Sequence, residues 1–320
     1  MPPRPCNQLH KPLRLERRRR VTIVAAFSCI DGIMICADTE ETTSSESKSE
    51  SDKLEVFQSA NGYVLCGGSG DSSLFELAVH RLQQDMSVHA YRSNEIEAVL
   101  NRHASQIFDK HIKCYRGFPS EWIPELFILI AVQVEGQARL YKWEKNFVLS
   151  ITDGHHDAIG TGFIQALPLL REHRFAMNLY SRQMFFFAVR IIQRVKRQVQ
   201  GCGGNTDVFV LHHNGERTRY TSSLVDTIEQ FADRVDAFSL QTLMTLITSP
   251  AAAEQEVDRA LDECSTEFKK FRREYVSEIY PMVTHVKSFT VGAFLQESAD
   301  KASLQVQVRP SIPEKSEPGQ

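Results

Sequence analysis

A short apolar hairpin near the N-terminus constrains the fold of this chain more than any other feature. Apolar residues run from Thr22 to Ser28, Asp31-Gly32 marks a turn, and a second apolar run from Ile33 to Ala37 ends at Asp38. Two such runs joined by a tight turn predict an antiparallel pair of strands. Because paired strands lie about 5 Å apart, Thr22 should come to lie beside Asp38.

Lys53, on the strand expected after the hairpin, can complete a cluster of hydroxyl, carboxylate and amine with Thr22 and Asp38. A threonine hydroxyl is a weak nucleophile until a base takes its proton, and an N-terminal threonine can use its own α-amine as that base. The cluster therefore predicts a nucleophile, Thr22, next to a charge pair.

These residues resemble the proteasome β-type subunits and their bacterial relatives, which are N-terminal-nucleophile (Ntn) threonine hydrolases. The spacing from Thr22 to Gly32 and on to Asp38 is that of the family, and Lys53 falls one residue short of the usual place. The segment Cys66-Gly67-Gly68-Ser69-Gly70-Asp71 is similar to the family's glycine-rich turn, in which the first glycine supplies an oxyanion-hole N–H.

The resemblance covers Val21 to Leu211 and implies further site residues. It gives the oxyanion N–H to Gly67 and a hydroxyl near the nucleophile's amine to Thr161, for which an ordinary helix start is an equal alternative. It assigns Thr42 and Ser69 to substrate binding, with the backbone of Thr42 pairing to an extended substrate by β-strand addition.

One departure from the family leaves the activity open. The family has an Asp-x-x-Ser-Gly-Gly turn whose Asp and Ser orient the nucleophile, and here Val199 and Cys202 stand at those two positions. Cys202 is kept as a candidate site residue.

The resemblance implies an α+β fold, a four-layer αββα sandwich of the Ntn-hydrolase type with a mainly helical C-terminal extension. The order of predicted strands and one-sided helices supports this fold. The predicted divisions are a disordered basic prefix or propeptide (1–20), the Ntn-hydrolase domain (21–215), a C-terminal extension packing on the core (216–309) and a disordered tail (310–320).

Composition excludes several classes of function. The formal net charge of −3 provides no basic field for nucleic acid or an anionic membrane. The longest apolar runs are far shorter than the roughly 20 residues that cross a bilayer. Seven single cysteines without a CxxC pair argue against a zinc site and a disulfide framework, and favour the cytoplasm. His155-His156-Asp157 has no third ligand nearby in sequence, so no metal is expected.

The favoured function is a threonine-type peptidase that cuts peptides or unfolded proteins inside a self-compartmentalised, homo-oligomeric ring. It requires no metal or organic cofactor, and an ATPase unfoldase is a candidate partner. The alternatives are a non-catalytic structural subunit of such an assembly and a small-molecule amidase on the same fold.

The residues ahead of Thr22 bear on this choice because the mechanism needs a free α-amine on Thr22. Self-cleavage in the family usually follows a glycine, and β-branched Val21 crowds that reaction. We expect the active polypeptide to begin at Thr22, by initiation at Val21 from a GUG codon rather than by processing.

Overall fold

The computed structural model describes residues 19–20, 22–42, 48–50, 52–119, 123–151, 155–172, 179–248 and 254–284. The predicted tail 310–320, most of the prefix and the end of the predicted extension lie outside these residues. Within the described parts, no helix has the length and apolar character needed to cross a membrane.

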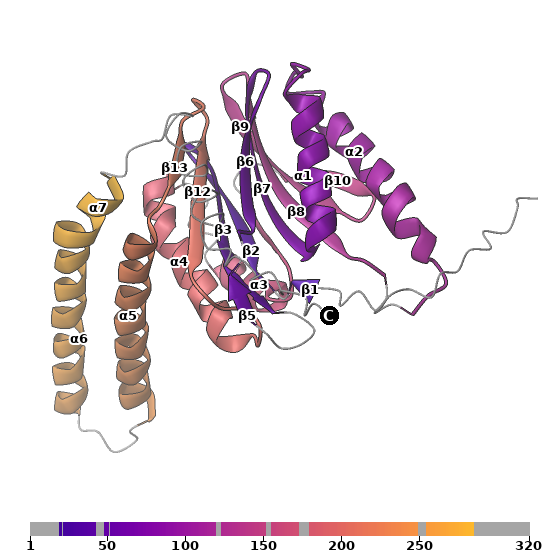
Figure 1. Ribbon diagram of the computed structural model, residues 1–320. Helices are drawn as coiled ribbons and strands as arrows, with labels where there is room; N and C mark the ends of the chain where they lie inside the picture. The colour runs from indigo at the N-terminus through magenta and orange to yellow at the C-terminus, as the bar shows by residue number, and fades with distance from the viewer. Residues whose placement is uncertain are drawn as a thin grey trace, which may run out of the picture.

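Two antiparallel sheets form the centre of the molecule (Figure 1). In the first, the strand order is β1-β7-β8-β9-β10, and β6 also pairs with β7. Its strands are β1 (Arg19–Arg20), β6 (Leu54–Ser59), β7 (Gly62–Asp71), β8 (Leu126–Val134), β9 (Gln137–Glu144) and β10 (Phe147–Ile151). The predicted α+β class is confirmed.

The second sheet has the order β11-β2-β3-β12-β13, and a separate two-stranded sheet pairs β4 with β5. The strands of the second sheet are β2 (Val24–Cys29), β3 (Gly32–Asp38), β11 (His156–Ile159), β12 (Thr206–His212) and β13 (Arg217–Arg219). The small sheet consists of β4 (Glu40–Thr42) and β5 (Lys48–Glu50). The segment predicted as a C-terminal extension thus begins with β13, a strand of the second sheet.

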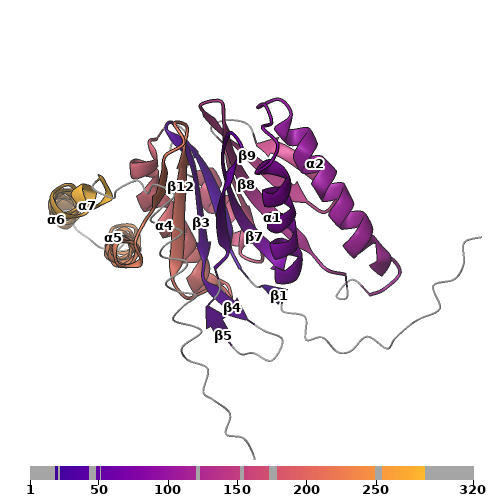
Figure 2. The same ribbon diagram turned by 45° about the horizontal axis from the view of Figure 1, so that its top comes forward.

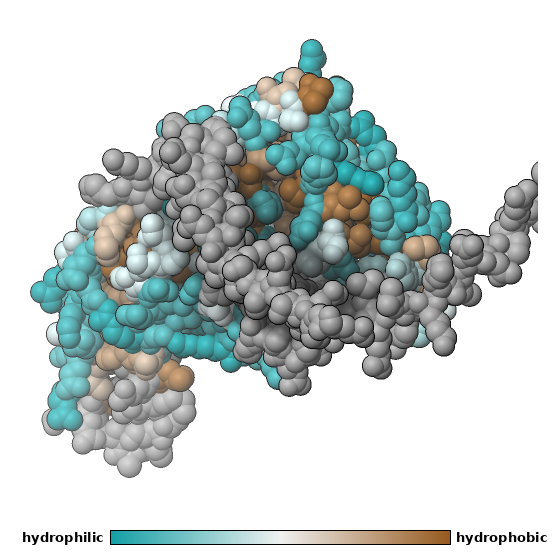
Figure 3. All heavy atoms as spheres, viewed as in Figure 1, coloured by the Kyte–Doolittle hydropathy of each residue, from teal (hydrophilic) through white to brown (hydrophobic). Residues whose placement is uncertain are grey.

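Helices cover the outer faces of the two sheets (Figure 2). On the first sheet lie α1 (Ser72–Met86) and α2 (Ile96–Ile107), which continues as a π-helical turn (Phe108–Ile112) and a 3₁₀ turn (Lys113–Tyr115). On the second lie α3 (Phe163–Glu172) and α4 (Ser181–Gln198), and α5 (Ser222–Thr248) packs on α4. Then come α6 (Glu254–Glu274), a π-helical turn (Tyr275–Ile279) and α7 (Tyr280–Thr284). On the face seen in Figure 3, the surface around α1 and α2 carries both hydrophilic and hydrophobic residues.

The central hairpin, β2 and β3, is buried on both faces. Side chains such as Val24 and Ile35 point into the core between the two sheets, whereas their neighbours Ala25 and Cys36 point into the core under α4. A strand covered on both sides needs no polar alternation, which explains the continuous apolar runs in the sequence.

Two predicted irregular segments are extended in the structure. The glycine-rich segment Cys66–Asp71 is the second half of β7 and not a turn. Arg19 and Arg20, the last residues of the predicted disordered prefix, form β1 and pair with Asp71 and Gly70.

Asp31, in the turn of the hairpin, ties β2 and β3 to the start of α4. Its carboxylate accepts hydrogen bonds from the N–H and the hydroxyl of Ser181, both at 2.7 Å, and the Nδ1 atom of His212 lies 3.5 Å away. Burial raises the pKa of Asp31, but the hydrogen bonds from His212 and Ser181 outweigh it and lower the pKa from 3.8 to about 2.

We predict that Asp31 makes stability dependent on pH in the acid range. Because its pKa is lower in the folded chain, the carboxylate stabilises the fold above about pH 4, and this contribution disappears as the pH falls toward 2. Asp31→Asn should lower the free energy of unfolding by about 1 kcal/mol at pH 7, and the difference in unfolding free energy between this variant and the wild type should shrink below pH 3.

Thermal unfolding measured between pH 2 and 7 tests this prediction. Glu76→Gln, at an exposed carboxyl on α1, is the control and should leave the unfolding temperature nearly unchanged. A constant difference between Asp31→Asn and the wild type across this range would contradict the assignment.

Candidate functional site

Asp38, the last residue of β3, is the centre of a buried polar cluster. Its Oδ1 atom accepts hydrogen bonds from the hydroxyl of Thr22 at 2.5 Å, the N–H of Ile23 at 3.0 Å and the ammonium of Lys53 at 2.8 Å. Its Oδ2 atom accepts the N–H of Gly203 at 2.9 Å. The structure therefore brings the three predicted residues together.

The charges of this cluster are compensated within the protein. Thr22 and Asp38 are 0% exposed and Lys53 is 1% exposed. The Lys53 ammonium also donates to the Glu40 carbonyl at 2.5 Å. A buried ion pair is tolerated when both partners are hydrogen-bonded. Here the Lys53 ammonium and the Thr22 hydroxyl both donate to the same carboxylate oxygen of Asp38.

The backbone around Thr22 is held from two sides. The N–H of Asp38 donates to the Ile23 carbonyl at 3.2 Å, and the N–H of Gly162 donates to the Thr22 carbonyl at 3.2 Å. Gly160, with φ of +95°, lies so close that a Cβ atom there would be 2.3 Å from the Thr22 carbonyl oxygen and 3.0 Å from the hydroxyl of Ser69. Gly160 therefore allows this turn to approach the Thr22 backbone closely.

The geometry does not support the predicted oxyanion role of Gly67. The N–H groups along β7 point alternately to its two neighbours. Gly68 donates to the Lys53 carbonyl next to β6, and Asp71 donates to the Glu125 carbonyl next to β8. The N–H of Gly67 therefore points to its β8 partner Leu129, away from Lys53.

The absence of a side chain at Gly67 has a packing reason instead. A Cβ atom at this position would lie 2.6 Å from the side chain of Val24 and 3.0 Å from that of Ile35. Glycine lets the two sheets approach each other closely at this point.

Two other predicted site residues, Thr161 and Cys202, form no hydrogen bond with Thr22, Asp38 or Lys53 among the contacts that the structure describes. Thr161 is exposed in the turn before α3 and forms no hydrogen bond with the buried cluster in the described structure. Cys202 is buried beside Gly162. Burial and, next, the negative charge of Asp38 raise the pKa of the Cys202 thiol to about 12, which keeps it protonated.

The predicted substrate-binding residues lie on strands that border the cluster. Ser69 is buried on β7. Thr42 ends β4 and pairs with Lys48 of β5. The strand β1 lies beside both β7 and β4.

No metal site emerges at His155-His156-Asp157. Among the residues that the structure describes, no three His, Cys, Asp or Glu side chains are grouped so that they could hold a metal ion.

Gly203 is a site residue that the sequence pattern did not reveal as such. The glycine-rich turn after α4 is visible in the sequence, but its N–H reaches a carboxylate 165 residues away in the chain. The sequence feature that could have indicated this contact is the run of glycines between α4 and β12, because glycines allow the backbone to approach another part of the chain closely.

Comparison with known proteins relates the chain to solved structures alone, since no protein-family model and no curated protein matches it. Anbu (ancestral beta-subunit) from Yersinia bercovieri superposes with a TM-score of 0.57 at 14% identity, over 73% of this chain and 100% of that one. The Anbu (Gly-1) mutant from Hyphomicrobium sp. strain MC1 has a TM-score of 0.59 at 14% identity, over 70% and 96% of the two chains.

A third match is described as the helical assembly of the Anbu complex from Pseudomonas aeruginosa, with a TM-score of 0.57 and 14% identity over 73% of this chain and 99% of that one. At this identity the likeness shows the fold alone. It also corrects the predicted family: the matching structures are Anbu proteins, which are proteasome-like but form a family distinct from the proteasome β-type subunits.

We predict that Gly160→Ala disturbs the site through the Thr22 backbone. The new Cβ atom would overlap the Thr22 carbonyl oxygen, and a positive φ adds strain, so the variant should lose more than about 2 kcal/mol of unfolding free energy. Denaturant unfolding measures this loss.

Gly136→Ala is the matched control, because Gly136 has φ of +76° with nothing within 4 Å of an added Cβ atom. It should cost only the backbone strain of about 1 to 2 kcal/mol. Equal losses for the two variants would show that the contact with Thr22 imposes no constraint.

Proposed function

We propose that the chain is an N-terminal-threonine hydrolase that cleaves peptide bonds with Thr22 as its nucleophile. The observation that carries this proposal is the 2.5 Å hydrogen bond from the Thr22 hydroxyl to Asp38, whose same oxygen binds the Lys53 ammonium. A hydroxyl that is hydrogen-bonded to a buried charge pair is suited to nucleophilic catalysis when a base lies beside it. The α-amine of Thr22 would be that base in a chain that begins at Thr22.

In the proposed reaction, the Thr22 oxygen attacks the carbonyl carbon of the scissile bond, and its proton passes to the free α-amine of Thr22. The tetrahedral intermediate then collapses, the proton moves to the departing amine, and an ester to Thr22 remains. Water hydrolyses this ester and restores the hydroxyl. The nearby Lys53 charge lowers the cost of negative charge on the Thr22 oxygen.

The chain with residues 1–21 attached is, as a single copy, an inactive form in this proposal. Its Thr22 nitrogen belongs to a peptide bond, and Thr22 is completely buried. The preceding residues Arg19 and Arg20 pair with the end of β7 beside the site. We propose that the active polypeptide begins at Thr22, where the amine is free.

The proposed enzyme has the four-layer αββα arrangement of Ntn hydrolases and works as an assembly of identical copies in the cytoplasm. The stacked sheets with helices outside support the first part. The description of one matching structure as a helical assembly of the Anbu complex supports the second by analogy.

A non-catalytic subunit of such an assembly is the second candidate function. It is favoured by the complete burial of Thr22 and by the buried thiol of Cys202, which stays protonated next to Asp38. In this role the ion pair would serve only to hold the hairpin and β6 together.

We predict that a chain beginning at Thr22 hydrolyses peptides and that the chain with residues 1–21 attached does not. Thr22 can be exposed by cleaving a removable fusion partner directly before it. Peptide turnover is then compared for this form, its Thr22→Ser variant and its Thr22→Ala variant. Thr22→Ser should retain measurable turnover because it keeps the hydroxyl, whereas Thr22→Ala should lose at least about 100-fold in kcat.

Mass spectrometry of the enzyme with a slow ester substrate should detect an adduct on Thr22. Absence of turnover and of the adduct in the folded form that begins at Thr22 would refute the enzyme proposal and leave the structural-subunit function.

A further inference from the structure

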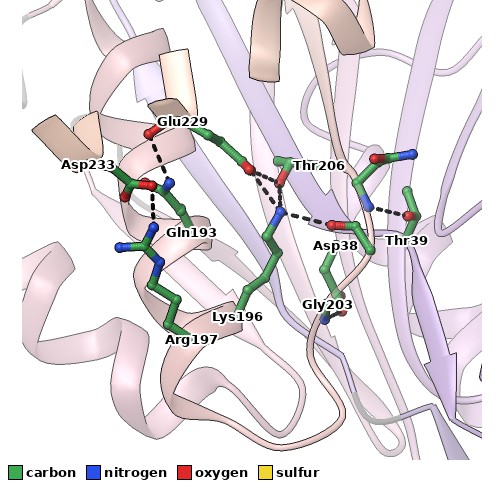
Figure 4. A network of polar contacts seen from close by, with 11 residues as sticks. Asp38, Thr39, Gln193, Lys196, Arg197, Gly203, Thr206, Glu229 and Asp233 are labelled. Carbon is green, nitrogen blue, oxygen red and sulfur yellow. Dashed lines mark hydrogen bonds and ion pairs between the residues drawn. The ribbon is translucent and has the colours of Figure 1, made fainter. Parts of the chain in front are cut away.

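Lys196, on α4, links helix α5 to the turn before β12 and to Thr206, the first residue of β12. Its ammonium donates hydrogen bonds to the Glu229 carboxylate on α5 at 2.8 Å, the Thr206 hydroxyl at 3.0 Å and the Gly204 carbonyl at 3.0 Å (Figure 4). The Lys196 and Glu229 side chains are only 11% and 18% exposed. All three donors of this ammonium therefore have an acceptor.

The anchor on α5 is itself fixed. The Thr206 hydroxyl donates to the same Glu229 oxygen at 2.7 Å, and the side-chain amide of Gln193 donates to the Glu229 carbonyl at 2.9 Å. Networks in which every member is satisfied hold a single geometry more firmly than isolated pairs.

The turn that Lys196 contacts is hydrogen-bonded to residues 38–40. The N–H of Gly203 donates to Asp38 Oδ2 at 2.9 Å, and the Gly203 carbonyl accepts the N–H of Glu40 at 3.1 Å. Thr39 forms two hydrogen bonds with Asn205. The Thr39 N–H donates to the backbone carbonyl of Asn205 at 2.9 Å, and the Asn205 N–H donates to the Thr39 hydroxyl at 2.9 Å.

These contacts reach both charges of the site. Asp38 is held directly by the Gly203 N–H, and Lys53 is held through the Glu40 carbonyl, which accepts its ammonium. Two residues that follow α4 carry no charge: Val199 is apolar, and Cys202 has a protonated thiol.

We propose that Lys196 is a positioning residue, anchored by Glu229, that holds the turn of residues 203–206 against residues 38–40 and thereby keeps Asp38 and Lys53 aligned on Thr22. This inference makes α5 a structural support of the site. Its activity readout rests on the proposed hydrolase function, but its structural readout does not.

The test compares Lys196→Met with the neighbouring variant Arg197→Met. Arg197 also joins α4 to α5, through an ion pair with Asp233, but the described structure gives it no contact with the turn. Both changes remove one ion pair between α4 and α5, and the Arg197–Asp233 pair is the more exposed of the two, with side chains 57% and 34% exposed. Arg197→Met therefore controls for the loss of an ion pair between these helices without loss of the contacts to the turn.

The first readout is amide hydrogen exchange of the segment that contains Gly203, measured by mass spectrometry on the chain of residues 1–320. In Lys196→Met this segment should exchange at least about 10-fold faster than in the wild type, because the turn opens more often. In Arg197→Met it should exchange at the wild-type rate.

The second readout is peptide turnover by the form that begins at Thr22. Lys196→Met should lower kcat about 10-fold with KM changed less than about 2-fold, because alignment of the charge pair is lost while substrate contacts remain. Glu229→Gln keeps an oxygen acceptor for Lys196 and should lose less than about 3-fold, whereas Glu229→Ala should resemble Lys196→Met.

Unchanged exchange of the Gly203 segment in Lys196→Met would overturn the inference, as would an equal increase in Arg197→Met. If Lys196→Met does not fold, Thr206→Val, which removes one of the three acceptors, is judged by the same exchange criterion. If no form hydrolyses peptides, the exchange result still decides whether Lys196 positions the turn, so failure of the proposed function is distinguished from failure of this inference.

Discussion

The structure depends on one buried carboxylate. Asp38 has no exposed surface, yet it accepts hydrogen bonds from a hydroxyl, an ammonium and two backbone N–H groups. These donors come from the two residues before β2, from the residue before β6 and from the turn after α4, so both sheets and α4 must be correctly placed before this charge is compensated. A buried charge without partners costs several kcal/mol, so this cluster couples assembly of the fold to assembly of the site.

Much of the site could be predicted from the sequence because its main residues lie close together in the chain. Both faces of β2 and β3 are buried, which leaves an unmistakable apolar hairpin, and the hairpin alone places Thr22 beside Asp38. The direction of the Gly67 N–H could not be predicted in this way, since it depends on which strand pairs with each edge of β7. The strand character of residues 66–71 was hidden for a related reason: glycine disfavours strands, but close packing against Val24 and Phe75 requires it there.

Contacts distant in sequence supplied what local patterns could not. The hydrogen bond from Gly203 to Asp38 spans 165 residues, and the hydrogen bond from Lys196 to Glu229 joins two helices that lie 33 positions apart at these residues. The matches to Anbu structures, at 14% identity, extend the fold across about 70% of the chain without deciding its chemistry. The chemistry has to be argued from side-chain geometry.

The pairing of β1 with β7 has a consequence for any extended polypeptide that approaches this edge of the first sheet. Arg19 and Arg20 already occupy the backbone partners at Asp71 and Gly70. A segment tethered to the same chain competes at an effective concentration in the millimolar range, so an incoming strand of weaker intrinsic affinity is displaced by simple mass action. The occupancy of this edge is thus set by chain connectivity, and cutting the tether changes it without altering a single contact in the core.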